Sequence, residues 1–106
     1  MKTVLIYRTS SDKEPFTEWL NDLGDPTTRR RILARLLRVS QCNYGDFKPV
    51  GKGVLELRFF FGPGYRVYFG EDGDNLVILL TGGDKDSQSR DIEQAQEYWQ
   101  EYLEND

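Results

Sequence analysis

The sequence predicts one α+β domain that spans residues 1–106 and has the element order β-α-α-β-β-β-α. Two observations lead to this prediction. Apolar residues recur at a helical spacing up to residue 42 and again after residue 87, and they alternate with polar residues between positions 54 and 69. A chain of 106 residues also has room for only one hydrophobic core. We therefore expect a mainly antiparallel sheet with a helical hairpin packed on one face.

The N-terminal segment predicts a short strand followed by a helix. Residues 4–7 form a β-branched and aromatic run, which favours a strand. Ser11 or Asp12 is expected to cap the helix, and Gly24 to end it. The apolar face of this helix has the i, i+3, i+4, i+7 spacing of Phe16, Trp19, Leu20 and Leu23.

A second helix is predicted from Pro26 to about Cys42, because Asp25 suits the N-cap and Pro26 the first helical position. Cys42 is expected to be a small apolar residue inside this helix. The apolar side comprises Ile32, Leu33, Leu36 and Leu37, and the opposite side carries Arg31, Arg35 and Arg38. The two helices would form a hairpin whose apolar faces turn to a sheet.

Three strands are predicted after a loop at residues 43–53. The first two, at 54–61 and 65–69, alternate apolar and polar side chains. A three-residue loop at 62–64 keeps their apolar faces together, and it sets Arg58 opposite Tyr68 and Phe60 opposite Arg66.

A turn at 71–74 leads to the third strand, at 76–80, whose unbroken apolar run predicts a central position covered on both sides. The last helix is expected to begin near Ser87 and to run to about Leu103. Its apolar stripe comprises Ile92, Ala95, Trp99, Tyr102 and Leu103.

The composition excludes several kinds of chemistry. The chain has no histidine, which excludes Ser-His-Asp and Cys-His catalysis and histidine-based zinc sites. One cysteine excludes an internal disulfide. The acids Asp84, Asp86 and Asp91 are interpreted as surface residues, so we predict neither a metal nor a cofactor. An enzyme built on this chain must use arginine, lysine, tyrosine and carboxylates.

Charge is distributed unevenly along the chain. Residues 25–66 hold nine basic and three acidic residues, whereas residues 67–106 hold two basic and eleven acidic ones. A basic surface of limited extent is therefore possible, but a single basic field is not. The N-terminal segment lacks the apolar run of a signal peptide and nothing later resembles a membrane span, so we expect a cytoplasmic protein.

Arg58, Arg66 and Tyr68 are predicted to project from one face of adjacent strands, away from the helical hairpin, and Glu56 shares that face. Two interpretations remain open. The face is either a partly solvated surface on which Glu56 pairs with an arginine, or a phosphodiester site without histidine. Guanidinium groups bind phosphate oxygens in a bidentate manner and stabilise charge that develops on phosphorus.

Four segments in order resemble the RelE/ParE toxin superfamily, and within it the HigB-like group called addiction module killer proteins. These segments are KPVG at 48–51, LELR at 55–58, GPGYRVY at 62–68 and LLTGGDK at 79–85. The resemblance covers nearly the whole chain and implies a RelE/ParE toxin-like fold. It also implies the toxin of a bacterial type II toxin-antitoxin system, neutralised by a small helix-turn-helix antitoxin.

RelE-like members cleave mRNA on the ribosome by attack of a 2′-OH on the adjacent phosphate, so the resemblance implies a metal-independent endoribonuclease. Carried over by position, Arg58 and Arg66 bind and stabilise the scissile phosphate, and Lys85 is a second cation or a proton donor. Tyr68 would stack on a base or orient the phosphate. Lys48 and Lys52 would hold the RNA backbone. No general base is assigned, and Glu56 is a candidate.

Two alternatives remain open. ParE-like members share the fold but inhibit DNA gyrase without cleaving RNA, and the acidic C-terminal segment departs from the basic character of RelE-type toxins. An inactive protein with the toxin fold is the other alternative. The arginines at 29–31, 35 and 38 are interpreted as a solvated helix face, or as a contact for rRNA or for acidic antitoxin residues.

Overall fold

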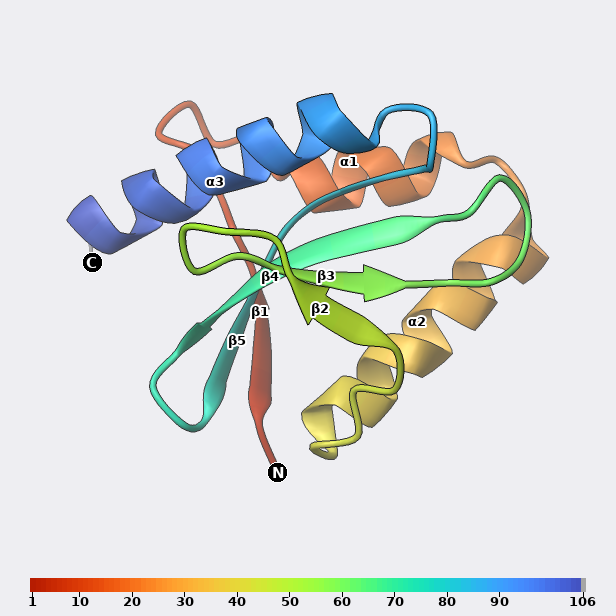
Figure 1. Cartoon of the computed structure of the whole chain (residues 1–106), viewed down its shortest axis with the longest axis horizontal. Coiled ribbons are helices and arrows are strands. Elements are labelled where there is room, and N and C mark those ends of the chain that lie inside the picture. The colour runs from red at the N-terminus through yellow and green to blue at the C-terminus, as the bar shows by residue number, and fades with distance from the viewer. Residues whose placement is uncertain (106) are drawn as a thin grey trace.

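The computed structural model describes residues 1–105 and shows an α+β domain with three helices and a five-stranded mixed sheet (Figure 1). The helices are α1 (Pro15–Asp22), α2 (Pro26–Ser40) and α3 (Gln88–Glu104). The strands are β1 (Thr3–Ile6), β2 (Phe47–Pro49), β3 (Leu55–Arg58), β4 (Arg66–Asp72) and β5 (Leu76–Gly83). No helix within residues 1–105 is both long and apolar enough to cross a membrane.

The strands lie in the order β1-β5-β4-β3-β2. Strand β1 runs parallel to β5, and the other neighbours are antiparallel. This order confirms the predicted central position of β5, whose residues 77–83 are all buried. The helical hairpin before the meander allows β1 to return as the parallel neighbour of β5.

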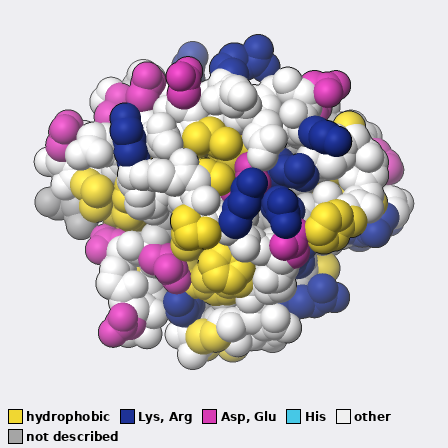
Figure 2. All heavy atoms as spheres, viewed as in Figure 1, with side chains coloured by type: hydrophobic (Ala, Val, Ile, Leu, Met, Phe, Trp, Pro, Cys, Tyr) yellow, Lys and Arg dark blue, Asp and Glu magenta, His cyan; other side chains and the backbone are white. Residues whose placement is uncertain are grey.

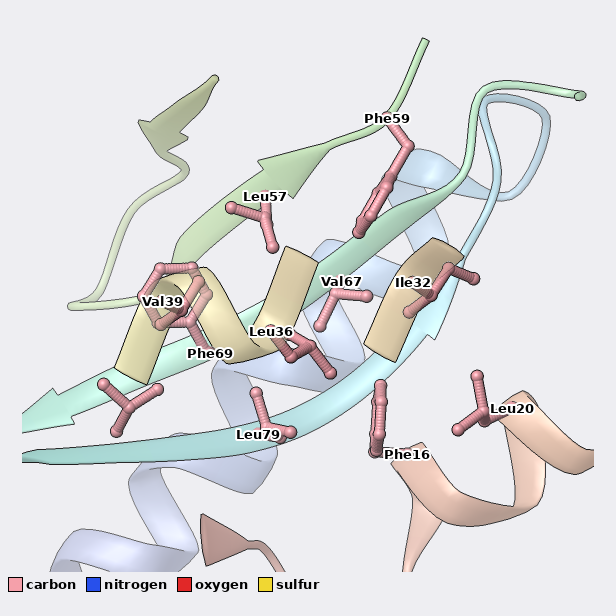
Figure 3. Packing of buried hydrophobic residues seen from close by; sticks show 11 residues of the cluster. Phe16, Leu20, Ile32, Leu36, Val39, Leu57, Phe59, Val67, Phe69 and Leu79 are labelled. Atoms are coloured by element: carbon pink, nitrogen blue, oxygen red, sulfur yellow. The ribbon is translucent and has the colours of Figure 1, made fainter. Parts of the chain in front are cut away.

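Two hydrophobic cores lie on the two faces of the sheet. Helices α1 and α2 pack on one face, where side chains of β3, β4 and β5 point toward them (Figure 3). Helix α3 packs on the other face through Ala95 and Trp99, which contact a cluster that includes Tyr68, Ile78 and Leu80. Successive side chains along a strand therefore point alternately toward α1 and α2 on one face and toward α3 on the other.

The loop predicted at residues 43–53 was wrong in part, because β2 lies within it and pairs with β3. This strand has three residues and ends at Pro49, a residue without an N–H group to donate. Such a short edge strand shows no alternation, so its existence depends on the exposed edge of β3. Its effect is to place Lys48 directly opposite Glu56.

The second helix ends at Ser40 rather than near Cys42. Cys42 is exposed and has a positive φ of 67°, so the prediction that it packs inside the helix was wrong. Leu33 and Leu37 are also exposed, whereas Val39 is buried with Ile32 and Leu36. The cap of α2 is as predicted, since the Asp25 side chain accepts a hydrogen bond from the Thr27 N–H.

Helix α1 begins after Glu14, so neither Ser11 nor Asp12 caps it. The register of β3 on β4 also differs from the prediction by two residues. Arg58 lies opposite Arg66, and Glu56 lies opposite Tyr68. A shift of two keeps every side chain on its predicted face, so the face assignment is confirmed although the pairs are different.

Candidate functional site

Arg58 and Arg66 form the centre of the candidate site, because they are cross-strand partners at one end of β3 and β4. Both project from the sheet face that α3 partly covers. Figure 2 shows Lys and Arg side chains gathered near the middle of one face of the molecule, with acidic side chains beside them. The predicted juxtaposition of the two arginines is therefore present, with two carboxylates beside it: Glu56, on the face predicted for it, and Asp46, which the sequence did not place there.

Asp46 is the first of these carboxylates. Arg58 donates two hydrogen bonds to it, from Nε to Oδ2 over 2.9 Å and from NH2 to Oδ1 over 3.1 Å. The pairing lowers the pKa of Asp46 and raises the pKa of Arg58. About a third of each side chain is exposed, so solvent reaches the pair. An anion that binds the Nε and NH2 edge of Arg58 must therefore share or displace Asp46.

Arg66 faces the second carboxylate, that of Glu56. The Glu56 side chain is fully buried, and 12% of the Arg66 side chain is exposed. Arg66 Nε lies 3.7 Å from Glu56 Oε1, and neither atom has a hydrogen-bond partner. Arg66 NH1 donates to the carbonyl of Gly64 over 3.0 Å. A buried charge next to an incompletely bonded partner is costly, so this pair is a strained point in an otherwise well-bonded core.

Tyr68 does not have the predicted role of stacking on a base, because its side chain is completely buried. Its hydroxyl donates to Glu56 Oε2 over 3.0 Å, and Gln88 Nε2 donates to the same oxygen over 2.9 Å. Burial raises the pKa of Tyr68, and the Glu56 charge adds to the effect. Tyr68 is thus a packing residue that orients Glu56. Its apolar ring belongs to the core beneath α3.

The same contacts argue against Glu56 as a general base. One of its oxygens accepts two hydrogen bonds and the other is turned toward Arg66. A general base must reach the proton it removes, and a side chain without exposed surface cannot do so in this conformation. Glu56 instead holds a negative charge beneath Arg66.

Lys85 is exposed and lies where β5 has ended. Its backbone N–H donates to the carbonyl of Pro63 over 3.3 Å, which ties it to the β3–β4 loop. Gly64 separates Lys85 from Arg66: a Cβ at Gly64 would lie 3.3 Å from the Lys85 Cβ and 3.4 Å from Arg66 NH1. Gly64 has a φ of +78°. The loop therefore brings Lys85 beside Arg66, and a glycine is needed at position 64.

The two lysines predicted to hold RNA have different surroundings. Lys48 is exposed on β2 and shares the face of Glu56, its cross-strand partner, so it can extend the cationic row. Lys52 has a φ of +55° and lines a hollow with Glu93 and Glu97 of α3. The negative charge of α3 makes Lys52 the weaker of the two candidates.

Three further residues belong to the site but were not identified from the sequence in these roles: Asp46, Gln88 and Asp91. Asp91 lies over Gly83, the cross-strand partner of Arg66, at a position that a Cβ on Gly83 would occupy. Burial raises the pKa of Asp91, and Ser87 donates a hydrogen bond to it.

Asp46 could have been identified if the pairing of β2 with β3 had been known, because the Arg58 N–H donates to the Asp46 carbonyl just before β2. Within residues 1–105, no group of three or more Cys, Asp or Glu residues is placed to hold a metal ion.

Arg35 was predicted to lie on the solvated side of α2, but the structure places it against the sheet. Its guanidinium donates to the backbone carbonyls of Tyr44, Asp46 and Arg58, over 2.7 to 3.2 Å. It also lies 5.0 Å from the centre of the Phe59 ring. Arg35 therefore fixes the segment that leads into β2 and the end of β3, which are the two pieces that carry Asp46 and Arg58.

Comparison with known proteins finds no family model that matches the chain. The chain is 46% identical over 80 residues to an uncharacterized protein of Haemophilus influenzae, and the match covers 76% of this chain and 81% of that protein. At this identity and coverage, the chain belongs to the same family as the Haemophilus influenzae protein.

Proposed function

We propose that this protein is the toxin of a bacterial type II toxin-antitoxin system, with the RelE/ParE toxin-like fold of the HigB-like group, and that it cleaves mRNA on the ribosome. The observation that carries the proposal is the juxtaposition of Arg58, Arg66 and Lys85 at one end of the sheet. These residues come from three of the four segments that resemble the superfamily. The α+β architecture and the order of the helices and strands are compatible with it.

The chemistry would require cations, an acceptor for the 2′ proton and the RNA itself. The 2′-oxygen attacks the adjacent phosphorus, the bond to the 5′-oxygen breaks, and a cyclic phosphate is left on the upstream nucleotide. Arg58 and Arg66 stabilise the charge on the phosphorane, and a group aimed at such charge contributes about 10²–10³ in rate. Lys85, which is exposed, supplies the proton to the departing 5′-oxygen. No residue is assigned as the base that accepts the 2′ proton.

Neutralisation by a small helix-turn-helix antitoxin is part of the same proposal. It predicts that induced expression of this protein in bacteria stops growth, and that co-expression of the neighbouring antitoxin gene restores growth. Normal growth in the presence of soluble, folded protein would contradict the active-toxin proposal and favour the inactive alternative.

The site is tested best through Arg58. Arg58 and Asp46 are both partly exposed, so Arg58→Ala should leave the thermal midpoint almost unchanged while it abolishes growth arrest. Arg66→Ala is less informative, because it leaves the buried Glu56 without its cation. Arg66→Lys retains that positive charge and loses the bidentate fork and the NH1 hydrogen bond to the Gly64 carbonyl, so it is the better second variant.

Arg8→Ala is the matched control, since Arg8 forms a similar exposed pair with Glu14 over 2.8 Å outside the site. It should arrest growth as the unmodified protein does. Primer extension on cellular mRNA then measures cleavage. Wild-type arrest by the Arg58→Ala protein would exclude the site. Arrest with intact mRNA and stalled replication would instead support the alternative, a ParE-like inhibitor of DNA gyrase, which the acidic surface of α3 favours.

A further inference from the structure

A hollow of about 350 Å³ opens between α2 and the segment that follows β3. It is lined by Arg31, Ala34, Arg35, Arg38 and the three phenylalanines at 59–61. This lining holds three arginines and no acid, in a chain whose net charge is −4. A hollow of similar size beside α3, about 390 Å³, has one lysine against Glu93 and Glu97. The hollow at α2 is therefore a cationic site in a protein that is acidic as a whole.

Two of the three arginines are available to a ligand. Arg35 is occupied by three backbone carbonyls, which leaves Arg31 and Arg38. Both are exposed, and they stand seven residues apart on α2, which puts them on the same side of the helix. The Arg31 guanidinium lies 3.7 Å from the centre of the Phe61 ring. Stacking on that ring restricts the guanidinium to one orientation at the rim of the hollow.

Phe60 is the aromatic element that the fold leaves unused. Its side chain is 82% exposed, whereas its neighbours Phe59 and Phe61 are buried or partly buried against the core. A phenyl ring with this exposure contributes little to folding and is accessible for stacking. It shares the hollow with Arg31 and Arg38.

We propose that this hollow binds one unpaired nucleotide of a single-stranded nucleic acid, with the base stacked on Phe60 and the flanking phosphates on Arg31 and Arg38. Cationic side chains beside an accessible ring are the combination used to hold unpaired strands. Acidic side chains alone would satisfy the arginines but would give the Phe60 ring no partner. The inference concerns binding alone and does not depend on RNA cleavage at Arg58 and Arg66.

The test measures binding of the full-length protein to three labelled oligomers of equal length at low ionic strength: oligouridine, oligothymidine and an abasic phosphodiester strand. Phe60→Ala should weaken oligouridine binding roughly tenfold and leave abasic binding unchanged, because only the stacked base is lost. Phe60→Trp should restore oligouridine binding. Arg31→Ala and Arg38→Ala should weaken all three oligomers, each lowering the salt slope by about 0.7.

Two variants serve as matched controls. Arg30→Ala removes an arginine from the same helix but outside the hollow, and Leu37→Ala removes an exposed apolar side chain from α2. Both should bind oligouridine nearly as the unmodified protein does. An equal loss for Phe60→Ala on oligouridine and on the abasic strand would overturn the proposal, as would polyglutamate that competes as well as oligouridine. A preference between oligouridine and oligothymidine would then identify RNA or DNA as the ligand.

Discussion

Arg35 and Arg66 lie at the same end of the sheet, yet the fold uses them in opposite ways. Arg35 approaches from α2 and donates to three backbone carbonyls, so its guanidinium is almost fully occupied by the protein. Arg66 projects to the other face, where Nε faces a carboxylate oxygen at 3.7 Å without a hydrogen bond. An arginine whose donors are satisfied internally is a structural element. The Arg66 Nε is buried, so an anion would have to bind the remaining N–H groups of the guanidinium, through the 12% of the side chain that is exposed.

The two arginines are connected through Arg58. Arg35 NH1 donates to the Arg58 carbonyl over 2.7 Å, while the Arg58 side chain turns to the opposite face and pairs with Asp46. The structural arginine therefore fixes the backbone from which a candidate functional arginine projects. Support of this kind keeps a binding group in one position before a ligand arrives.

The largest effect should come from removal of Arg35. Arg35→Ala leaves three backbone carbonyls without their charged donor, and each such loss costs about 1–3 kcal/mol. Because Arg35 is only partly buried, we expect a total loss near the low end, roughly 3–5 kcal/mol in the free energy of unfolding. Urea denaturation measures it. Arg38→Ala, on the exposed side of the same helix, should change stability by less than about 0.5 kcal/mol. Equal losses for the two variants would contradict the structural role of Arg35.

A medium effect is expected from Glu56. Glu56→Gln removes the buried charge beneath Arg66 and should cost roughly 2 kcal/mol, because the partly buried Arg66 guanidinium then has no counter-ion. The pKa of Tyr68 should also fall, because the Glu56 charge contributes to its elevation. Urea denaturation measures the loss in the free energy of unfolding.

Glu71 provides the control for this variant, since it also accepts from a tyrosine, Tyr44, and pairs with a cation, Lys2, but is more exposed. Glu71→Gln should cost less than about 1 kcal/mol in the free energy of unfolding. If Glu71→Gln proved as costly as Glu56→Gln, burial would not be what distinguishes the two carboxylates.

The smallest effect on stability should come from Asp46. Its pKa is lowered by Arg58, so the pair stabilises the fold above the ordinary carboxyl pKa of about 4, and the contribution is lost as pH falls through the lowered value. Asp46→Asn should therefore lower the thermal midpoint slightly at neutral pH and not at all in strong acid. Thermal melts across this pH range check the sign. A midpoint difference that grows in acid would contradict it.

Asp46→Asn should have opposite effects on the stability of the fold and on anion binding by Arg58. Asp46→Asn frees the Arg58 guanidinium from its two charged hydrogen bonds, so affinity for a phosphodiester should rise while stability falls slightly. For Arg35 no such exchange is possible, because its acceptors are backbone carbonyls that no side-chain substitution removes.

The sequence by itself determined the class of fold, the central place of β5 and the face on which each strand residue lies. These features follow from periodicity, since a period of two fixes alternate faces whatever the exact pairing. The face shared by Glu56, Arg58, Arg66 and Tyr68 was predicted correctly even though the register was wrong by two residues. The last helix, with Ser87 before it, was also predicted closely, because its stripe spans several turns.

Only the tertiary structure decided what stands opposite each of these groups. Strand β2 has three residues and no alternation, so neither it nor the Arg58–Asp46 pair could be predicted. Arg35 turns inward and Tyr68 is buried because α2 and α3 approach the sheet at those points. The position of a charged or aromatic residue in the sequence pattern is the same whether its side chain contacts solvent, a carboxylate or several backbone carbonyls. Its role therefore depends on partners that are distant in the chain and are brought together only by folding.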